Sequence, residues 1–202
     1  MATPEPITLR SPSRYTSPPK NKTFTPPPLD FLCRTWAVSH STLSMWRSAQ
    51  NVRITYRPLP ASPKGNRERV DDLVEYEGLN TSAKKVKSVA GIDTAEQAGD
   101  GSVWTWRGKG LLALVSSHWE LLGWGERVRP DGSSERWMVS WFAATLFTSE
   151  GLDILTDRRE GPSQETVDAV LNALAGLEAK SVADLVANDM RPVAINLPWT
   201  ER

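Results

Sequence analysis

The feature that most constrains the fold is a long series of strand-like segments that comes before any segment with a helical pattern. About eight short runs rich in apolar and β-branched residues follow one another, separated by turn-like residues. The clearest run, Asn51–Pro58, alternates Val52, Ile54 and Tyr56 with polar side chains, as a strand with one buried face does. Consecutive strands without intervening helices exclude a doubly wound α/β fold. The expected strands are 31–41, 51–58, 70–76, 84–93, a segment ending near Arg107, 111–124, 136–146 and 152–156.

The short connections between these segments indicate how the strands are joined. The Asp-Gly sequence within Arg129–Ser134 is a hairpin signal, and most other gaps are also of hairpin length. A meander of about eight strands can close into a barrel, which removes exposed edges and leaves room for a small ligand. We therefore predict a mainly β fold, an eight-stranded up-and-down barrel followed by a C-terminal helix. A β-sandwich is the alternative.

The two ends of the chain have different patterns from the middle. Residues 1–29 are rich in proline, serine and threonine and lack an apolar period, which predicts a disordered tail. After the last strand, Ser163 can cap a helix with an apolar stripe, and Ser181–Asp184 fits a capping box before a second short helix. The predicted organisation is a tail over 1–29, a ligand-binding β-barrel over 30–160 and a helical extension over 161–202.

Composition excludes several classes of partner. The chain has 24 basic and 24 acidic residues, so its net charge gives no reason to expect nucleic acid or an anionic membrane. No apolar run approaches the roughly 18 residues of a membrane span. A single cysteine, Cys33, excludes an internal disulfide and is typical of a reducing compartment, so we expect a cytoplasmic protein. The sequence does not indicate an oligomeric state.

The stretch Val103–Gly125 is the first candidate for chemistry. It holds four of the nine tryptophans and one of the two histidines. Read with a period of two, His118 and Glu120 share a strand face with leucines, where a lone charge would be unfavourable. We interpret His118 as a general acid or base inside the barrel, supported by Glu120 or by Asp72, which falls on the apolar face of its own strand. The alternative is a polar pair on a solvated face.

Aromatic and basic side chains supply the expected ligand-binding wall. His40 lies four residues after Trp36 and shares its strand face, and Arg107 could bind a carboxylate or phenolate or pair with Asp72 or Asp93 in the barrel wall. No cofactor is expected, although two imidazoles and a carboxylate, from His40, His118 and Glu120, would suit a divalent metal. The ligand-binding candidates are Trp36, His40, Tyr56, Trp104, Trp106, Arg107, Trp124 and Trp141.

A tryptophan early in the first strand, eight strands and a following helix resemble the lipocalin-like, or calycin, barrels. The usual opening of that family is Gly-x-Trp, whereas here Arg34 stands two residues before Trp36. An arginine late in the lipocalin barrel packs on this tryptophan, so the resemblance implies that role for Arg158 or Arg159.

The strings SHSTLSMW, NVRITYRPL, WRGKG and SSHWELLGWG, with the run from Trp141 to Asp153, are similar to a group of small intracellular fungal proteins with lipocalin-like barrels. This similarity covers about residues 30–160. Some proteins of this kind accompany natural-product biosynthesis, so the resemblance implies a hydrophobic, polyketide- or terpenoid-like ligand.

These observations lead to a functional hypothesis with two alternatives. We expect the chain to bind an apolar or phenolic, natural-product-like molecule against tryptophan walls and to transform it by non-redox acid/base chemistry, as a cyclase or isomerase. The first alternative is a non-catalytic carrier or sensor that uses the same pocket. The second is an interaction module that uses the apolar outer face of the barrel and the C-terminal helix.

Overall fold

The computed structural model describes residues 7–16, 24–79, 85–129, 131–146 and 148–200. Within these residues, nine strands form one sheet, in the order β2-β3-β4-β5-β6-β7-β8-β1-β9. The strands are β1 (Thr35–Ser41), β2 (Ala49–Leu59), β3 (Arg69–Gly78), β4 (Val86–Gln97), β5 (Asp100–Gly108), β6 (Ser116–Val128), β7 (Ser134–Phe142), β8 (Gly151–Thr156) and β9 (Arg191–Pro192).

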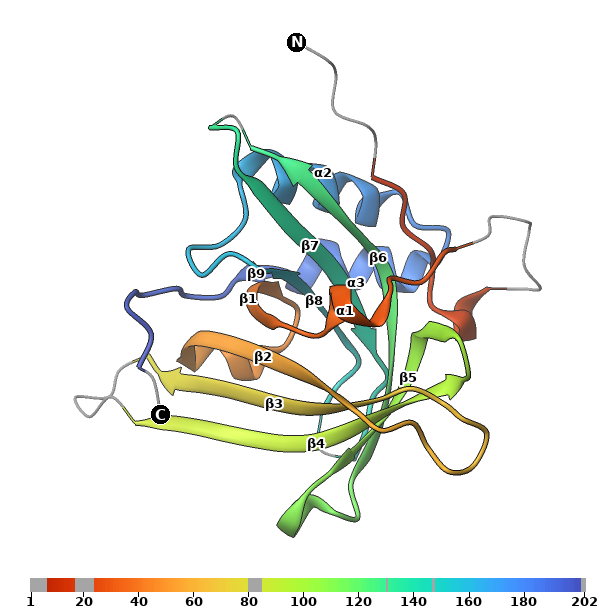
Figure 1. Cartoon of the computed structure of the whole chain (residues 1–202). Coiled ribbons are helices and arrows are strands. Elements are labelled where there is room, and N and C mark those ends of the chain that lie inside the picture. The colour runs from red at the N-terminus through yellow and green to blue at the C-terminus, as the bar shows by residue number, and fades with distance from the viewer. Residues whose placement is uncertain (1–6, 17–23, 80–84, 130, 147, 201–202) are drawn as a thin grey trace.

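Strands β1 to β8 form the closed barrel that the sequence predicts (Figure 1). Each strand pairs antiparallel with the next, and β1 closes the barrel because it pairs with both β2 and β8. Strand β9 adds two residues to the edge of β1. The predicted mainly β fold, an up-and-down barrel followed by helix, is therefore confirmed.

The helices lie at the ends of the chain. They are α1 (Leu29–Leu32), α2 (Gln164–Ala175) and α3 (Lys180–Asp189), with short 3-10 turns at η1 (Ser13–Tyr15), η2 (Ser44–Ser48) and η3 (Gly110–Leu112). Ser163 caps α2 as expected, since its side chain accepts a hydrogen bond from the backbone N–H of Thr166. The expected capping box is wrong, because α3 starts after Ala179 and Ser181 lies within the helix. None of the helices in the described ranges is both long and apolar enough to span a membrane.

Two apolar cores lie on opposite faces of the sheet. The inner core lies inside the barrel and includes Trp104, Leu121 and Met138. The outer core lies between strands β6–β8 and the helices α2 and α3, and includes Trp141 and Leu174. Figure 1 shows these helices along the outside of the barrel. Because they cover this apolar outer face, the expected interaction surface is used within the chain itself.

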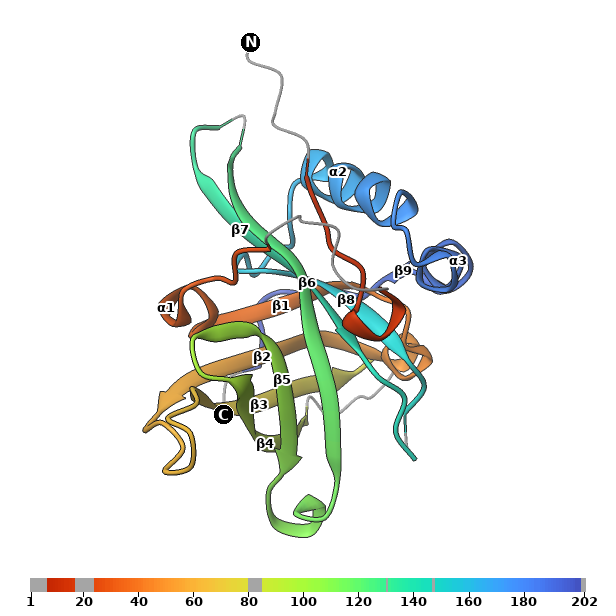
Figure 2. The same cartoon turned by 90° about the vertical axis from the view of Figure 1, so that its right-hand side faces the viewer.

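Residues 7–16 lie against the outside of β6, although the sequence places them in the expected disordered tail (Figure 2). The backbone N–H of Arg10 donates to the Leu122 carbonyl at 2.8 Å, and the Ser11 hydroxyl accepts from the Ala179 N–H at 3.1 Å. Leu9 packs directly over Gly123, where a Cβ atom would collide with it. A segment that cannot form a core of its own thus packs on the outer core. Residues 1–6 and 17–23 of the same expected tail lie outside the described residues.

Two β-bulges change which side chains face the interior. In β1 the register shifts between Val38 and His40, so that Ser39 is an extra residue. In β6 a similar shift makes Leu122 the extra residue. Beyond each bulge the side chains that alternation alone would place on one face lie on the other.

Candidate functional site

The interior of the barrel contains a group of buried aspartates, of which the sequence predicts only Asp72. Among the described residues, three aspartates are buried there, Asp72 on β3, Asp93 on β4 and Asp153 on β8. Tyr56 on β2 lies nearby, and burial, followed by the charges of the three aspartates, raises the pKa of its hydroxyl group. Ionised carboxyl groups are strongly disfavoured away from water unless they are paired or hydrogen-bonded.

The hydrogen-bond partners of these carboxyl groups come from neighbouring strands. The Trp119 indole N–H donates to Asp93 Oδ1 at 2.7 Å. Asp72 interacts with the Trp106 indole and with Asp93, and Asp153 interacts with the hydroxyl of Ser41. One oxygen of each aspartate nevertheless has no partner among the described residues: Asp72 Oδ1, Asp93 Oδ2 and Asp153 Oδ1.

The electrostatics of the interior follow from this burial. Burial raises the pKa of Asp93 to about 7, although hydrogen bonds from Trp119 and Asp72 oppose the shift. Burial also raises the pKa of Asp153 to about 7, against the opposing effect of Ser41. Burial, followed by the charges of Asp93 and Asp71, raises the pKa of Asp72 well above its usual range. Carboxyl groups of this kind can donate or accept a proton near neutral pH.

A column of stacked aromatic rings stands beside the carboxyl groups. The Trp119 ring lies between Tyr56, with centroids 6.0 Å apart, and Trp104, at 5.7 Å and an interplanar angle of 10°. Trp106 also points inward, and its indole occupies the space that a Cβ atom would need at Gly91. The interior therefore combines flat apolar surfaces with hydrogen-bonding groups, which is the usual composition of a small-molecule site.

Aromatic residues also close both ends of the barrel. At one end Trp46, on η2, is buried and packs edge-on against Tyr76 at 5.3 Å. At the other end the Trp36 indole donates to the Leu32 carbonyl at 2.9 Å, and Trp124 packs edge-on against Phe31. The guanidinium over Trp36 belongs to Arg34, so the expectation that Arg158 or Arg159 takes this position is wrong. Arg158 pairs with Glu160 and Arg159 stacks on Trp199.

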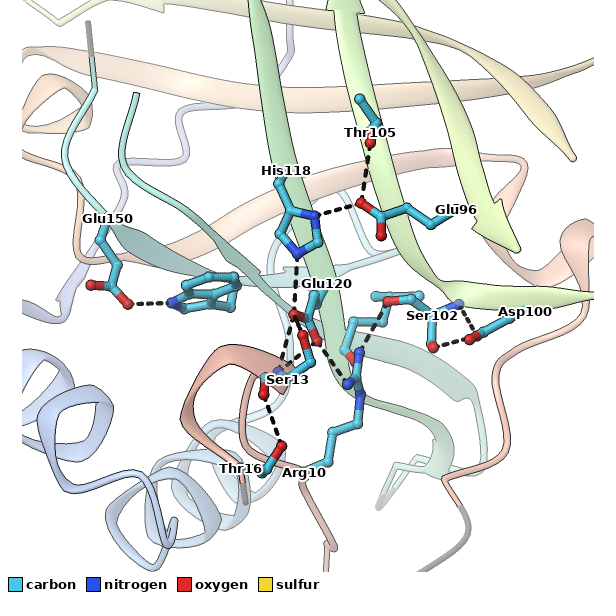
Figure 3. Close-up of polar contacts among 12 residues, drawn as sticks. Arg10, Ser13, Thr16, Glu96, Asp100, Ser102, Thr105, His118, Glu120 and Glu150 are labelled. Atoms are coloured by element: carbon cyan, nitrogen blue, oxygen red, sulfur yellow. Dashed lines mark hydrogen bonds and ion pairs between the residues drawn. The ribbon is translucent and has the colours of Figure 1, made fainter. Parts of the chain in front are cut away.

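The structure places the predicted pair His118 and Glu120 outside the barrel, which corrects the expectation of an interior acid/base pair. Trp119 and Leu121 occupy the inner face of β6, so their neighbours point outward. The His118 imidazole lies between two carboxylates, with Nδ1 2.7 Å from Glu96 and Nε2 3.2 Å from Glu120 (Figure 3). The side chains lean together, which makes the direct contact possible despite their separation along the strand.

Glu120 is the anchor of the N-terminal segment. Its side chain is fully buried and receives hydrogen bonds from the Ser13 N–H and hydroxyl and an ion pair from Arg10 at 2.7 Å (Figure 3). Burial alone would raise the pKa of this carboxyl group, but the hydrogen bonds from Ser13 and the charge of Arg10 hold it below its usual value. Glu120 thus contacts the N-terminal segment on one side and His118 on the other.

Three other predicted site residues also face away from the interior. The bulge at Ser39 turns His40 outward beside Ile154, and burial there lowers the pKa of the imidazole. Trp141 belongs to the outer core. Arg107 is exposed, and its guanidinium donates to the Ala113 carbonyl at 3.1 Å. By contrast, the predicted residues Trp36, Tyr56, Asp72, Trp104, Trp106 and Trp124 all contact or lie within the inner core.

The alternative metal site does not form from its three expected ligands. His40 contacts Ser39 from the outer face of β1, whereas His118 and Glu120 contact each other on β6. In the described parts of the chain, no group of three or more histidine, cysteine, aspartate or glutamate side chains is arranged to hold a metal ion. The expectation that the protein uses no cofactor stays a prediction.

Sequence reasoning missed Asp93, Asp153 and Trp119. A signal was present for Asp153, because it stands between Leu152 and Ile154 in a short apolar strand. Asp93 lies on the same strand face as Gly91 and Ala95, two small residues that leave space in the interior. Trp119 directly follows His118, so the prediction that His118 lies inside the barrel puts Trp119 on the outer face.

Comparisons with known proteins place this geometry in a wider context. No protein-family model matches the chain. It is 27% identical over 194 residues to "Botcinic acid biosynthesis cluster B protein 12" of Botryotinia fuckeliana (strain B05.10), covering 93% of this chain and 83% of that protein. Among solved structures, apocrustacyanin C2 aligns with a TM-score of 0.50 at 11% identity, over 95% of this chain and 91% of that one. Lobster apocrustacyanin A1 aligns with a TM-score of 0.49 at 10% identity, over 95% and 90%. The likeness to apocrustacyanin C2 confirms the lipocalin-like fold.

Proposed function

We propose that this protein binds a flat small molecule inside its barrel and converts it by non-redox acid/base chemistry that Asp72, Asp93 and Asp153 supply. The observation that carries the proposal is the presence of three buried carboxyl groups, each with an oxygen that has no hydrogen-bond partner among the described residues. Leaving such atoms unsatisfied is unfavourable, so a bound molecule that contacts them would offset part of that free energy.

The surroundings of the carboxyl groups favour a particular kind of ligand. The ring column of Tyr56, Trp119 and Trp104 suits an aromatic or conjugated surface. A hydroxyl group of the ligand can donate to an ionised carboxylate, and a carbonyl group can accept from a protonated one. The relative named for a biosynthesis cluster supports a natural product as the ligand class. A phenolic or carbonyl-bearing, mostly apolar molecule meets these requirements.

The proposed reaction moves protons and leaves the oxidation state unchanged. An ionised carboxylate removes a proton from a carbon next to a ligand carbonyl, and the electron pair shifts towards the carbonyl oxygen. A protonated carboxyl group stabilises this oxygen by donating its proton. In an isomerisation the first carboxyl group returns its proton to a different carbon, and the enol oxygen gives its proton back to the second. In a cyclisation the enolate carbon instead attacks a second carbonyl carbon of the same molecule; the π bond of that carbonyl breaks, and its oxygen takes up the proton removed in the first step. Asp72 and Asp93 can take these two roles because they lie side by side on β3 and β4 with raised pKa values.

A non-catalytic carrier is the second candidate, and the aromatic column favours it. Apolar contact with the edges of the Tyr56, Trp119 and Trp104 rings would hold a flat ligand without any proton transfer. The two candidates therefore share a site and differ in whether the carboxyl groups act on the ligand. Cytoplasmic location stays our proposal for the compartment, supported by the lone Cys33.

The test follows binding and turnover in the same variants. Binding is measured by quenching of tryptophan emission with 1-naphthol, and turnover by the conversion of 3-cyclohexenone to its conjugated isomer. We expect Trp119→Leu to weaken binding, whereas Trp141→Phe, in the outer core, leaves it unchanged. Asp93→Asn should retain binding and lower turnover by about 10²–10⁴. Binding without any turnover that depends on the carboxyl groups would favour the carrier. Equal binding in the parent and in Trp119→Leu would show that the ligand binds outside the barrel.

A further inference from the structure

The turn between β5 and β6 exposes leucines to an unusual degree. The sequence predicts a strand that starts at Leu111, but β6 starts at Ser116 and the preceding residues form the turn η3 and its continuation. Leu111 and Leu114 are 105% and 95% exposed, respectively. Figures 1 and 2 show this hairpin projecting beyond the body of the barrel.

Hydrogen bonds hold the turn in an ordered shape. The Gly108 N–H donates to the Val115 carbonyl at 3.1 Å, which closes the turn at its base, and the Val115 N–H donates back to the Leu112 carbonyl at 2.8 Å. Gly110 has a φ of +58°, in the left-handed region that glycine tolerates best. The leucines are therefore presented outward by a defined structure.

Basic side chains surround the base of the turn. The sequence from Val103 to Ser117 includes Arg107 and Lys109 and contains no aspartate or glutamate. Arg107 also lines an outer groove of about 330 Å³ with Arg67 and Arg69. A carboxylate does lie nearby, since Asp71 pairs with Lys109. Glu96 also lies nearby, since it accepts a hydrogen bond from Thr105 in the lining of the same groove. The three arginines and Lys109 outnumber these two carboxylates, which leaves an excess of positive charge.

We propose that the β5–β6 turn docks the protein on the surface of an anionic phospholipid bilayer. Leu111 and Leu114 would enter the interfacial layer, and the arginines at the base would contact lipid phosphates. The shape favours lipid over a protein partner, because a flat protein surface cannot cover both sides of a narrow tip, whereas lipid closes around it. Exposed apolar surface next to basic residues is a common feature of proteins that bind membrane surfaces. This inference is independent of the proposed function.

Flotation of the full chain with vesicles tests the proposal. The vesicles contain phosphatidylcholine with phosphatidylserine, or phosphatidylcholine alone. We expect Leu111→Ser/Leu114→Ser to lower partitioning by at least about tenfold, since the apolar insertion is lost. Arg69→Gln/Arg107→Gln should lower it about fivefold or more on the anionic vesicles and little on the neutral ones. Val128→Ser/Leu146→Ser removes two other exposed aliphatic side chains and is the matched control, which should bind like the parent.

Three outcomes would overturn the proposal. The first is a parent protein that stays unbound with both kinds of vesicle. The second is an equal loss of binding in the control variant, which would mean that the leucines have no special role. The third is a parent that forms a dimer in light scattering, dissociated by the leucine variant, without binding vesicles; the turn would then contact a second copy. Near-ultraviolet circular dichroism confirms that each variant keeps the parent's fold.

Discussion

At the scale of single residues, the interior aspartates link stability to pH in an unusual direction. A paired surface carboxylate has a lowered pKa and stabilises a protein as pH rises. Asp93 and Asp153 have pKa values raised to about 7, so the folded chain binds protons that the unfolded chain releases between about pH 4 and 7. The contribution of these two groups to the free energy of unfolding therefore falls as pH rises through this range, whereas the lowered pKa of His40 acts in the opposite direction.

We expect the unliganded protein to be more stable at pH 5 than at pH 8, and Asp93→Asn to reduce this difference. At pH 8 the variant should be more stable than the parent by about 1–3 kcal/mol, because it no longer carries a buried charge. Urea unfolding at the two pH values measures both effects. Asp131→Asn, at an exposed turn, is the control. A parent whose stability rises from pH 5 to pH 8 would contradict the raised pKa values.

Individual residues also show where sequence alone cannot locate the site. Tyr56, Asp72, Trp104 and Trp106 could be placed inside because one face of each strand suits the interior. His118 could not, because both faces of β6 carry large apolar side chains and both are covered, one by the inner core and one by residues 7–16. Alternation defines two faces of a strand, but only the packing of the whole chain decides which one is inside.

At the scale of elements, the N-terminal segment illustrates how a stretch without its own core can still be part of the fold. Its proline-rich composition predicts a tail, and composition cannot reveal that a distant strand offers a buried carboxylate. Arg10 reaches Glu120, and it also donates to the carbonyl groups of Leu121, at 2.7 Å, and Ser102, at 3.1 Å. The eight strands, in contrast, were predictable because each carries a local pattern of its own, either alternating or continuously apolar.

Arg10→Met should lower the free energy of unfolding by about 1–3 kcal/mol, because it leaves the buried Glu120 without its charged partner. This range is below that of a fully buried pair, since 21% of the Arg10 side chain is exposed. A double-mutant cycle with Glu120→Gln measures the coupling by urea unfolding. Arg14→Met changes a neighbouring exposed arginine and should have little effect. Equal losses in the two arginine variants would show that the ion pair contributes nothing specific.

At the scale of the whole molecule, the two cores share strands β6–β8. Trp137, Val139 and Trp141 on β7 face the outer core, whereas Met138 faces the inner one. Residues beyond α3 also bond to the barrel, since the side chain of Asn51 on β2 forms two hydrogen bonds with the backbone of Asn196. The barrel and its C-terminal helices therefore depend on each other, although the sequence divides them into a barrel over 30–160 and a helical extension over 161–202.

Removing residues 161–202 should prevent the barrel from folding, because it uncovers the outer face of β7 and β8. We expect a truncated chain that is insoluble or lacks the parent's near-ultraviolet circular dichroism. Supplying residues 161–202 as a separate chain during expression is the control and should restore some folded protein. A soluble truncated chain that melts cooperatively near the parent's temperature would show that the barrel is an independent domain.

The bulge at Ser39 has a consequence for how such a protein can evolve. One extra residue in β1 separates Val38, which faces inward with Leu155, from His40, which faces outward with Ile154. Deleting a single residue there would remove the bulge. The side chains that follow it in β1 would then change faces, so that those on the outside would point inward and those on the inside outward. Substitutions alter a binding cavity one group at a time, whereas a gain or loss at a bulge changes several at once. Lineages of this barrel could therefore acquire new ligands through short insertions and deletions within strands, a class of change that usually survives only in loops.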